Sequence, residues 1–491
     1  MLLSDLTKAD RNVYAVSPDP QIHGLTADSR NVKPGYLFAA LPGYELDGRE
    51  FITDAISNGA AAILAPKDTF LPSEIDHIPL IRVENPRRSL ALFSKEFYKI
   101  QPSITAAVTG TNGKTSVAWF TQYLWKLMGH QSAAMGTLGT TALKTSQKSK
   151  ARLTTADPVT LHCELKDLVD RDIDHLVLEA SSHGLEQYRL DGVRLTAGAF
   201  TNLSQDHLDY HGSMERYRSA KLRLFDRLLM KGATAVLNSD SAEFELFSTT
   251  CKSRGVNVIG YGRNAKDIRI NSVNAKPNGQ RISLNLLGKN YELDVKLIGR
   301  FQAQNLLCAL GLIIACGDEP ERAMAILPKL QGPPGRLELV SHTLNGAPVY
   351  VDYAHTPGAL AAMLSALRPH TVGSLTLIFG CGGNRDKTKR PLMGAIANNL
   401  ADKIYLTDDN PRKESPSKIR AEIKANCPKA IEIGDRSEAI QHAIINLSSQ
   451  DTLVIAGKGH ESGQVIGEKI VPFQDGMVAR NFIAAIKGRE L

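Results

Sequence analysis

Short apolar runs, each long enough for one strand, recur along the first part of the chain. They occur at residues 36–41, 60–65 and 80–83, and Gly, Pro and charged residues typical of turns separate them. Residues 87–100, which follow, carry apolar side chains at the spacing of one helix face. The pattern predicts a small α/β domain that covers residues 1–98.

The pattern changes at Ile104, where buried-type apolar runs begin. Residues 104–110 have the composition of a buried strand, and the apolar positions of residues 116–130 predict a helix after a glycine-containing loop. Alternating strands and helices are typical of a largely parallel sheet covered on both faces, which predicts a central doubly wound domain over residues 99–333. Its further elements are expected as strands at 176–180, 197–201, 233–237 and 256–261, a β-like stretch at 281–297 and a helix at 305–316.

Paired prolines and glycines at residues 331–335 interrupt regular structure and predict a linker to the last domain, residues 334–491. Strand-like and helical patterns alternate again after this linker, as in a Rossmann-like, doubly wound unit. The strands are expected at 349–354, 375–380, 403–408 and 451–457, and the helices include 357–367 and 418–425. The predicted fold class is therefore α/β with three domains.

Composition adds few constraints. The chain of 491 residues is 43% hydrophobic and 22% charged, as in an ordinary globular protein. Its basic residues form no dense block, so we expect no nucleic-acid partner. The six scattered cysteines predict reduced thiols, and no apolar run reaches the roughly 20 residues of a membrane helix. We expect a monomeric cytoplasmic protein without a signal peptide or membrane span.

The loop before the helix at 116–130 has the chemistry of a phosphate site. Backbone N–H groups of a glycine-rich turn approach phosphate oxygens, and the helix N-terminus adds a favourable dipole. Lys114 supplies positive charge to the terminal phosphates, and the Thr115 hydroxyl suits Mg²⁺. The alternative, a glycine turn without a ligand, is disfavoured by the strand–loop–helix context. The predicted ATP-binding loop consists of Gly110, Thr111, Asn112, Gly113, Lys114, Thr115 and Ser116.

Two further strand ends carry candidate metal ligands. Glu179 ends the strand predicted at 176–180, and a carboxylate there points into the crevice where open α/β sheets bind ligands. The segment 201–212 follows another strand and concentrates acidic and histidine side chains, which favours a functional site over isolated structural histidines. The candidates in this segment are Asp206, His207, Asp209 and His211.

Three loops of the last domain predict an amino-acid pocket, because each follows a strand of one parallel sheet. Pro411 stiffens the loop, and the planar fork of Arg412 suits bidentate binding of a carboxylate. A ligand with an extra carboxylate and an ammonium fits this set; the alternative is a turn with a structural arginine. The predicted pocket contains Arg385, Asp409, Asn410, Pro411, Arg412, Gly457 and Glu461.

These motifs together resemble the Mur ligase family. The shortened loop TGTNGKT, the segments EASSHGL and TNLSQDHLDYH, and the DNPR motif of its diaminopimelate-adding members all occur in order. The resemblance implies that Thr115 and Glu179 hold one Mg²⁺ and that His207 holds a second. It also implies that Lys221 is carbamylated by CO₂ and serves as a metal ligand; from the residues alone Lys221 would be a surface lysine.

The resemblance assigns further contacts that the residues alone do not. It implies that Asn305 reads the adenine and that Arg336 and Asp352 contact the nucleotide, whereas Gln302 replaces an asparagine of the family pattern. The contacts implied for the UDP-linked substrate are Ala27, Ser29, Tyr44, Glu45, Leu46, Thr154, Thr155, Ser181, Gln187 and Arg189.

The implied activity is ATP-dependent formation of an amide bond in peptidoglycan synthesis. Meso-diaminopimelate would be joined to the D-glutamyl γ-carboxylate of UDP-N-acetylmuramoyl-L-alanyl-D-glutamate through an acyl phosphate, with Lys114, Glu179, His207 and Lys221 as the catalytic set. The phosphate loop would act together with the Arg412 pocket. Two enzymes are alternatives, a lysine-adding sister ligase and folylpolyglutamate synthase, and a nucleotide-dependent switch is the non-enzyme alternative.

Overall fold

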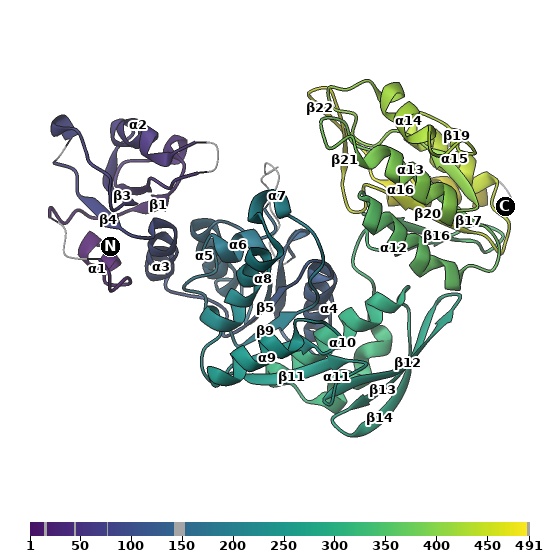
Figure 1. Cartoon of the computed structure of the whole chain (residues 1–491), viewed down its shortest axis with the longest axis horizontal. Coiled ribbons are helices and arrows are strands. Elements are labelled where there is room, and N and C mark those ends of the chain that lie inside the picture. Colours follow the sequence, from purple (N-terminus) through teal and green to yellow (C-terminus); the bar gives the residue numbers. More distant parts are fainter. Residues whose placement is uncertain (14–16, 44–45, 76, 142–152, 489–491) are drawn as a thin grey trace. The chain divides into compact units, whose positions relative to one another are not determined.

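The computed structural model describes residues 1–13, 17–43, 46–75, 77–141 and 153–488 (Figure 1). By contacts the chain divides into two compact units. The first comprises residues 1–267 and 308–323, and the second comprises residues 268–307 and 324–491. Both units combine helices with largely parallel sheets, so the predicted α/β class is confirmed. The predicted limits of the three domains stay a prediction.

The N-terminal part of the first unit is a four-stranded parallel sheet in the order β1-β2-β3-β4. Leu37, Leu64 and Phe93 are buried in its core. Asn85 accepts a hydrogen bond from the backbone N–H of Arg88 and so caps the helix that follows the last strand. The elements are β1 (Gly24–Thr26), β2 (Tyr36–Ala39), β3 (Ala60–Pro66), β4 (Leu80–Val83) and α3 (Pro86–Tyr98), close to the predicted runs.

The rest of the first unit surrounds a sheet with the strand order β11-β10-β9-β5-β8-β6-β7, which is parallel except for the pair β6–β7. The predicted strands are confirmed within a residue or two, whereas β6 and β7 were not predicted. The strands are β5 (Ile104–Thr109), β6 (Ser132–Gly136), β7 (Gly139–Thr140), β8 (His175–Glu179), β9 (Ala197–Phe200), β10 (Thr234–Asn238) and β11 (Asn257–Gly262). The main helices are α4 (Lys114–Leu127), α5 (Pro158–Val169), α8 (Met214–Arg223) and α9 (Phe244–Ser253).

The second unit begins with an antiparallel meander of β12 (Ile268–Lys276), β13 (Gly279–Leu286) and β14 (Lys289–Val295). The β-like stretch predicted at 281–297 corresponds to the last two of these strands. The helix predicted at 305–316 is α10 (Arg300–Ala315), whose residues are divided between the two units.

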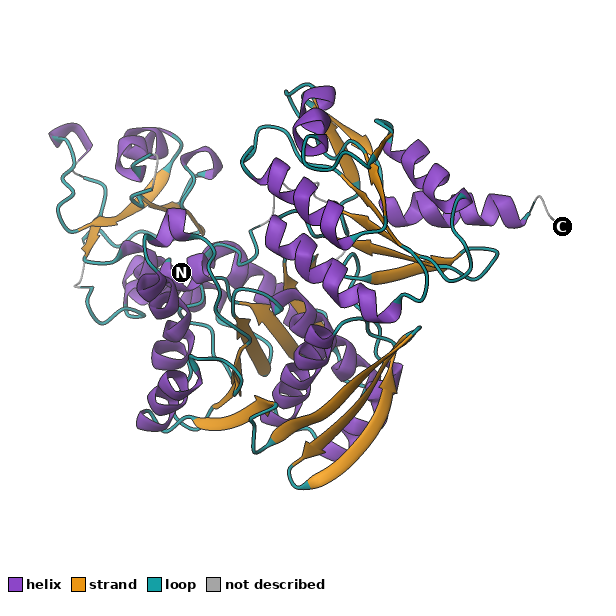
Figure 2. Cartoon of the chain, turned by 45° about the vertical axis from the view of Figure 1, so that its right-hand side comes forward, coloured by secondary structure: helices purple, strands orange, loops and turns teal. Residues whose placement is uncertain are grey.

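A six-stranded sheet in the order β15-β16-β20-β17-β18-β19 forms the larger part of the second unit. Its central strands are parallel, so their carboxyl ends share one edge, where the loops of the predicted amino-acid pocket begin. In Figure 2 helices flank this sheet on both sides. The elements are β15 (Glu338–His342), β16 (Pro348–Asp352), β17 (Leu375–Phe379), β18 (Lys403–Leu406), β19 (Ile431–Glu432), β20 (Thr452–Ala456), α12 (Pro357–Leu367), α13 (Lys389–Leu400), α14 (Pro416–Lys424), α15 (Arg436–Ile445) and α16 (Asp475–Lys487).

None of the helices in the described part of the chain combines the length and the apolar character that a bilayer crossing requires.

A fully buried ion pair holds the first turns of α15 and α16 together. Arg436 Nε and Nη2 donate to the two carboxylate oxygens of Asp475 at 2.6 and 2.7 Å, and both side chains have no exposed surface. Nη2 also donates to the carbonyl of Ala456, at the end of β20, at 2.9 Å. Arg436 therefore joins two helix starts to one strand end.

We expect Asp475→Asn to lower the free energy of unfolding of the second unit by about 3–5 kcal/mol, because it leaves a buried guanidinium without its counter-charge. Urea titration measures this change. The matched control is Glu468→Gln, which removes an ion pair to Lys413 whose side chains are 68% and 82% exposed. That control should change the unfolding free energy by less than about 1 kcal/mol; equal effects of the two substitutions would contradict the assignment.

Candidate functional site

The predicted phosphate loop connects β5 to α4, and its glycines have conformations that other residues rarely adopt. Gly113 precedes the first residue of α4 with φ of 90°, and Gly110 has φ of 148°. A Cβ atom at Gly110 would lie 1.9 Å from the hydroxyl oxygen of Thr201. Both positions therefore require glycine, for backbone conformation and, at Gly110, also for close approach of the next strand's loop.

The segment after β9 fixes the shape of the phosphate loop. The N–H of Thr111 donates to the carbonyl of Asn202 at 2.8 Å, and the N–H of Asn112 donates to the Asn202 side-chain oxygen at 3.0 Å. Lys114 Nζ lies over the loop and donates to the carbonyls of Gly110 and Thr111 at 2.8 and 2.9 Å. The lysine charge is thus held beside the backbone that is predicted to receive phosphates.

Glu179, at the end of β8, is buried next to this loop. Its carboxylate accepts hydrogen bonds from the hydroxyl of Thr115 at 2.9 Å and from the N–H and hydroxyl of Thr137 at 2.9 and 3.1 Å. Burial raises the pKa of the Glu179 carboxyl, and the charge of Lys114 and these hydrogen bonds oppose that rise. The sequence interpretation missed Thr137, whose place follows from the pairing of β6 with β8.

Lys221 lies on α8 and is 1% exposed, so the interpretation of this residue as a surface lysine from the residues alone is wrong. Its ammonium nitrogen lies 4.2 Å from the centre of the Tyr217 ring. Burial and, to a smaller extent, the nearby charge of Lys114 lower the pKa of Lys221 to about 6. The amine is consequently neutral near pH 7.

His207 belongs to a group of histidine and tyrosine rings around Lys221. Its backbone has φ of 51°, and its side chain is 49% exposed. Its ring centre lies 4.9 Å from that of His183 and 6.3 Å from that of Tyr217. His211 is buried, which lowers its pKa to about 4. Asp206 and Asp209, the other candidates in this segment, lie near this group, and their role as metal ligands stays a prediction.

Five residues of the first unit that were predicted to contact the UDP-linked substrate form one network beside Glu179. The Thr155 hydroxyl donates to the Glu179 carbonyl at 2.7 Å and lies 3.0 Å from the Ser181 hydroxyl. Arg189 donates to the Thr155 carbonyl at 2.7 Å and to the Gln187 side chain at 2.6 Å. The last member, Thr154, has its hydroxyl 3.3 Å from that of Thr137. Burial lowers the pKa of Arg189, so an anionic ligand would be favoured there.

The other predicted UDP contacts lie in the N-terminal part. Ala27 and Ser29 follow β1, close to a hollow of about 360 Å³ whose lining includes Arg30 and Lys33. Leu46 is 63% exposed. Tyr44 and Glu45, also predicted, lie outside the described residues.

The three residues predicted to contact the nucleotide outside the phosphate loop belong to the second unit. Asn305 is buried in α10, and its side-chain amide donates to Gln302 at 3.0 Å. Asp352 accepts from two backbone N–H groups at 2.8 Å each. Arg336 lies 4.7 Å from the centre of the Tyr353 ring, and its buried Nε has no hydrogen-bond partner within the described residues.

The structure brings the side chain of Arg412, in the loop after β18, next to the loop after β17 that carries Arg385. Arg412 Nη1 donates to the carbonyl of Gly383 at 2.9 Å, which fixes the guanidinium plane. A Cβ atom at Gly382 would lie 2.8 Å from Arg412 Nη1 and 3.9 Å from the Arg385 Cγ atom, so the two side chains flank this glycine. A guanidinium carries five N–H donors, and its anchoring leaves donors for a ligand carboxylate.

A buried lysine organises the opposite side of this pocket. Lys458 has no exposed surface, and its Nζ donates to Asn410 Oδ1 and to Glu461 Oε2 at 3.0 Å each. The Asn410 amide also donates to Glu461 at 2.9 Å. Asp409 is buried behind Asn410, where burial raises the pKa of its carboxyl. Lys458 was not predicted, although it stands between the predicted residues Gly457 and Glu461.

Pro411, also predicted for this pocket, is buried, and its carbonyl lies against Gly383. Gly457 has φ of 114°, and a Cβ atom there would lie 2.6 Å from the Asp409 carboxylate. The predicted pocket residues of the second unit are thus brought together at the carboxyl ends of β17, β18 and β20.

Comparisons with known proteins agree with this arrangement. Three family models match successive stretches: "Mur ligase family, catalytic domain" at residues 21–98, "Mur ligase middle domain" at 108–313, and "Mur ligase, glutamate ligase domain" at 335–459. They correspond in order to the three predicted domains.

Similar whole proteins carry one name, UDP-N-acetylmuramoyl-L-alanyl-D-glutamate–2,6-diaminopimelate ligase. The protein from Caulobacter vibrioides is 48% identical over 93% of this chain and 94% of its own length. The protein from Mesorhizobium japonicum is 47% identical over 97% of both chains. A solved structure with this name matches with a TM-score of 0.71 and 33% identity over 95% of both chains. With matches across its whole length, in sequence and in structure, the chain belongs to the Mur ligase family.

Proposed function

We propose that this chain is the ligase that adds meso-diaminopimelate to the γ-carboxylate of D-glutamate in UDP-N-acetylmuramoyl-L-alanyl-D-glutamate, with ATP as the energy source. The observation that carries the proposal is the pocket around Arg412, which combines the anchored guanidinium of Arg412 with the hydrogen-bonded Asn410–Lys458–Glu461 network around a fully buried lysine. Diaminopimelate has a second carboxylate and a second ammonium, which such a pair of charged surfaces would bind. The names of the similar proteins support the same substrate.

The first step activates the carboxylate. A glutamyl γ-carboxylate oxygen attacks the γ-phosphorus of ATP, the bond to the β-phosphate oxygen breaks, and ADP leaves an acyl phosphate behind. The phosphate loop supplies backbone N–H groups, and Lys114 supplies positive charge where negative charge accumulates. Arg189, buried beside Thr155, is suited to orient the anionic peptide substrate.

Mg²⁺ would neutralise the phosphate charges when bound. Glu179 fits such an ion, because its buried carboxylate is flanked by the hydroxyls of Thr115 and Thr137, and all of these groups are oxygen donors. His207 would serve a second ion near Lys221.

Lys221 is suited to carry the carbamate. Its neutral Nζ attacks CO₂, one N–H proton passes to solvent, and the product is an N-carboxylate. Burial favours this reaction, because it keeps the amine unprotonated near pH 7. The carbamate converts a neutral amine near Lys114 into an anion, which the positive charge of Lys114 stabilises.

The second step forms the amide. The amine of diaminopimelate attacks the carbonyl carbon of the acyl phosphate, inorganic phosphate leaves, and the nitrogen loses a proton. The ligand's second carboxylate would be bound by Arg412 and Arg385, and its ammonium by Glu461 and Asp409. Because the reaction consumes ATP, we propose that the protein acts in the cytoplasm. We also expect the protein to be a monomer.

The substrate test is phosphate release from ATP in the presence of UDP-N-acetylmuramoyl-dipeptide, with diaminopimelate or lysine as the amine. Lysine lacks the second carboxylate, so we expect its kcat/KM to be lower by at least roughly 100-fold. Arg412→Ala should lower kcat/KM for diaminopimelate roughly 10- to 100-fold, since charge-assisted hydrogen bonds contribute about 1.5–3 kcal/mol.

Arg412→Ala should lower kcat/KM for lysine less than kcat/KM for diaminopimelate, so the ratio of the two constants should move closer to one. Lys413→Ala is the matched control, because that side chain is 68% exposed and pairs with Glu468. A wild-type preference for lysine would overturn the proposed substrate, and phosphate release that ignores both substrates would favour a nucleotide switch.

Lys221→Met should lower kcat roughly 100-fold or more through loss of an electrostatic group at the phosphates. The wild-type enzyme should lose activity as the pH falls below about 6, because a protonated Lys221 cannot react with CO₂. With ¹³C-labelled bicarbonate, a carbamate resonance should appear in the wild type and in the control Lys252→Met, which changes an exposed lysine. The same resonance in Lys221→Met would contradict the site.

Lys458→Met should raise the KM for diaminopimelate with a smaller change in kcat, because Asn410 and Glu461 lose the donor that fixes them. The KM for ATP should stay unchanged, which separates this effect from general unfolding. Steady-state kinetics with each substrate varied in turn measures both constants. Equal losses for the two substrates would contradict a role confined to the amino-acid pocket.

A further inference from the structure

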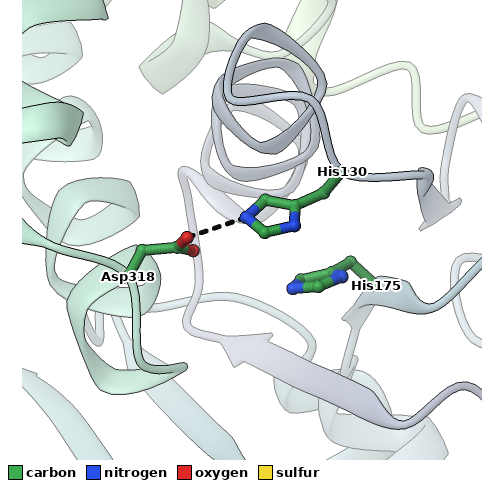
Figure 3. A group of neighbouring side chains, drawn as sticks. All are labelled: His130, His175 and Asp318. Atoms are coloured by element: carbon green, nitrogen blue, oxygen red, sulfur yellow. Dashed lines mark hydrogen bonds and ion pairs between the residues drawn. The ribbon is translucent and has the colours of Figure 1, made fainter.

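Three potential metal ligands from distant parts of the sequence meet in the first unit (Figure 3). His130 follows α4, His175 is the first residue of β8, and Asp318 follows α10. One ligand atom from each of them lies within 4.8 Å of the other two. The two imidazole rings are stacked, with centres 4.0 Å apart and an angle of 28° between their planes.

Hydrogen bonds from neighbouring side chains orient these groups, as hydrogen bonds also orient the ligands of bound metal ions in proteins. His130 Nε2 lies 2.7 Å from Asp318 Oδ1, and the indole N–H of Trp125 donates to Asp318 Oδ2 at 3.1 Å. His175 Nδ1 lies 2.8 Å from a carboxylate oxygen of Asp174. Because that carboxylate accepts a hydrogen, Nδ1 carries the proton and the Nε2 lone pair of His175 is left for a ligand.

The set has the composition of a transition-metal site. Two neutral imidazoles and one carboxylate are a donor combination that Zn²⁺ uses with water as the fourth ligand, at distances of about 2.0–2.2 Å. A tetrahedral ion with ligands at such distances holds two ligand atoms about 3.3 Å apart, so its insertion between His130 Nε2 and Asp318 Oδ1 requires these atoms to separate by about 0.6 Å from 2.7 Å. The side chain of His130 is 26% exposed, which provides a path of entry.

This position is separate from the proposed Mg²⁺ site. The helix α4 begins at Lys114 and ends before His130, and the strand β8 begins at His175 and ends at Glu179. His130 and His175 therefore lie at the ends of these two elements that are opposite to the phosphate-loop lysine and the buried carboxylate, and Asp318 contacts His130 there. Mg²⁺ prefers all-oxygen coordination, so imidazole ligands favour a different ion here.

We propose that His130, His175 and Asp318 form a structural binding site for Zn²⁺ or a similar divalent transition metal. An ion there joins the end of α4, the start of β8 and the segment after α10 in one coordination sphere. Because the ion binds the folded chain, it stabilises the first unit. The site is independent of the proposed ligase reaction.

The experiment measures Zn²⁺ binding to the full chain after chelator treatment, by equilibrium dialysis against Zn²⁺ with excess Mg²⁺ to occupy oxygen-ligand sites. We expect one tightly bound Zn²⁺ per wild-type chain and a rise in the melting temperature on its addition. His175→Gln and Asp318→Asn should lose both effects. The control His77→Gln changes an exposed histidine and should behave as the wild type.

Asp174→Asn tests the site with all three ligands still in place, in case the ligand variants fail to fold. Asp174 is exposed and would not itself bind the ion. It should weaken Zn²⁺ binding roughly 10- to 100-fold while the metal-free melting temperature stays close to that of the wild type. Co²⁺ in place of Zn²⁺ should give the visible absorption of a four-coordinate ion in the wild type and in His77→Gln, but not in His175→Gln or Asp318→Asn. Absence of tight Zn²⁺ binding by the wild type, or equal binding by the wild type, His175→Gln and Asp318→Asn, would overturn the proposal.

Discussion

The buried carboxylate of Glu179 is the constraint around which the nucleotide half of the molecule is built. A carboxylate removed from water is costly unless hydrogen bonds and positive charge compensate it. Thr115 supplies one compensating hydrogen bond from the phosphate loop, and Thr137 supplies two from the loop after β6. The charge of Lys114 adds to them. The need to satisfy one acid therefore fixes the loop, the helix start and the neighbouring strand end together.

In the second unit the buried charged groups are positive, and they too have compensating partners. Lys458 and Arg436 are fully buried cations near the end of β20, and each has an acidic partner, Glu461 for the lysine and Asp475 for the arginine. These pairs hold the loops that present Arg412. Because these donors are already ordered, they lose little conformational entropy when they bind a charged ligand. In both units, parallel strands deliver the charged groups to one edge of a sheet, where a ligand can reach them.

The sequence predicted much of this because short apolar runs and glycine loops are local signals. The strands at 60–66 and 80–83 and the helix at 357–367 follow directly from such runs. The strand β6 was missed because small residues such as those of Ser132–Gly136 have weak strand preference. Thr137 was missed for a related reason, since its role exists only once β6 pairs with β8, a contact between distant parts of the chain.

Two lysines illustrate why burial decides chemistry that residue type does not. Lys221 and Lys458 are both buried, yet Lys458 donates to Asn410 and Glu461, whereas Lys221 lies against the ring of Tyr217 and close to another cation, Lys114. A lysine beside a carboxylate is stabilised as a cation and can position its neighbours. A lysine removed from water and close to a like charge is driven toward the neutral amine, which is the form that reacts with CO₂. The sequence of α8 is mostly polar and lysines are rarely buried, so the residue type of Lys221 gives no sign that it faces inward. The fold alone creates that difference. It underlies the two roles that we propose, a reactive one for Lys221 and a positioning one for Lys458.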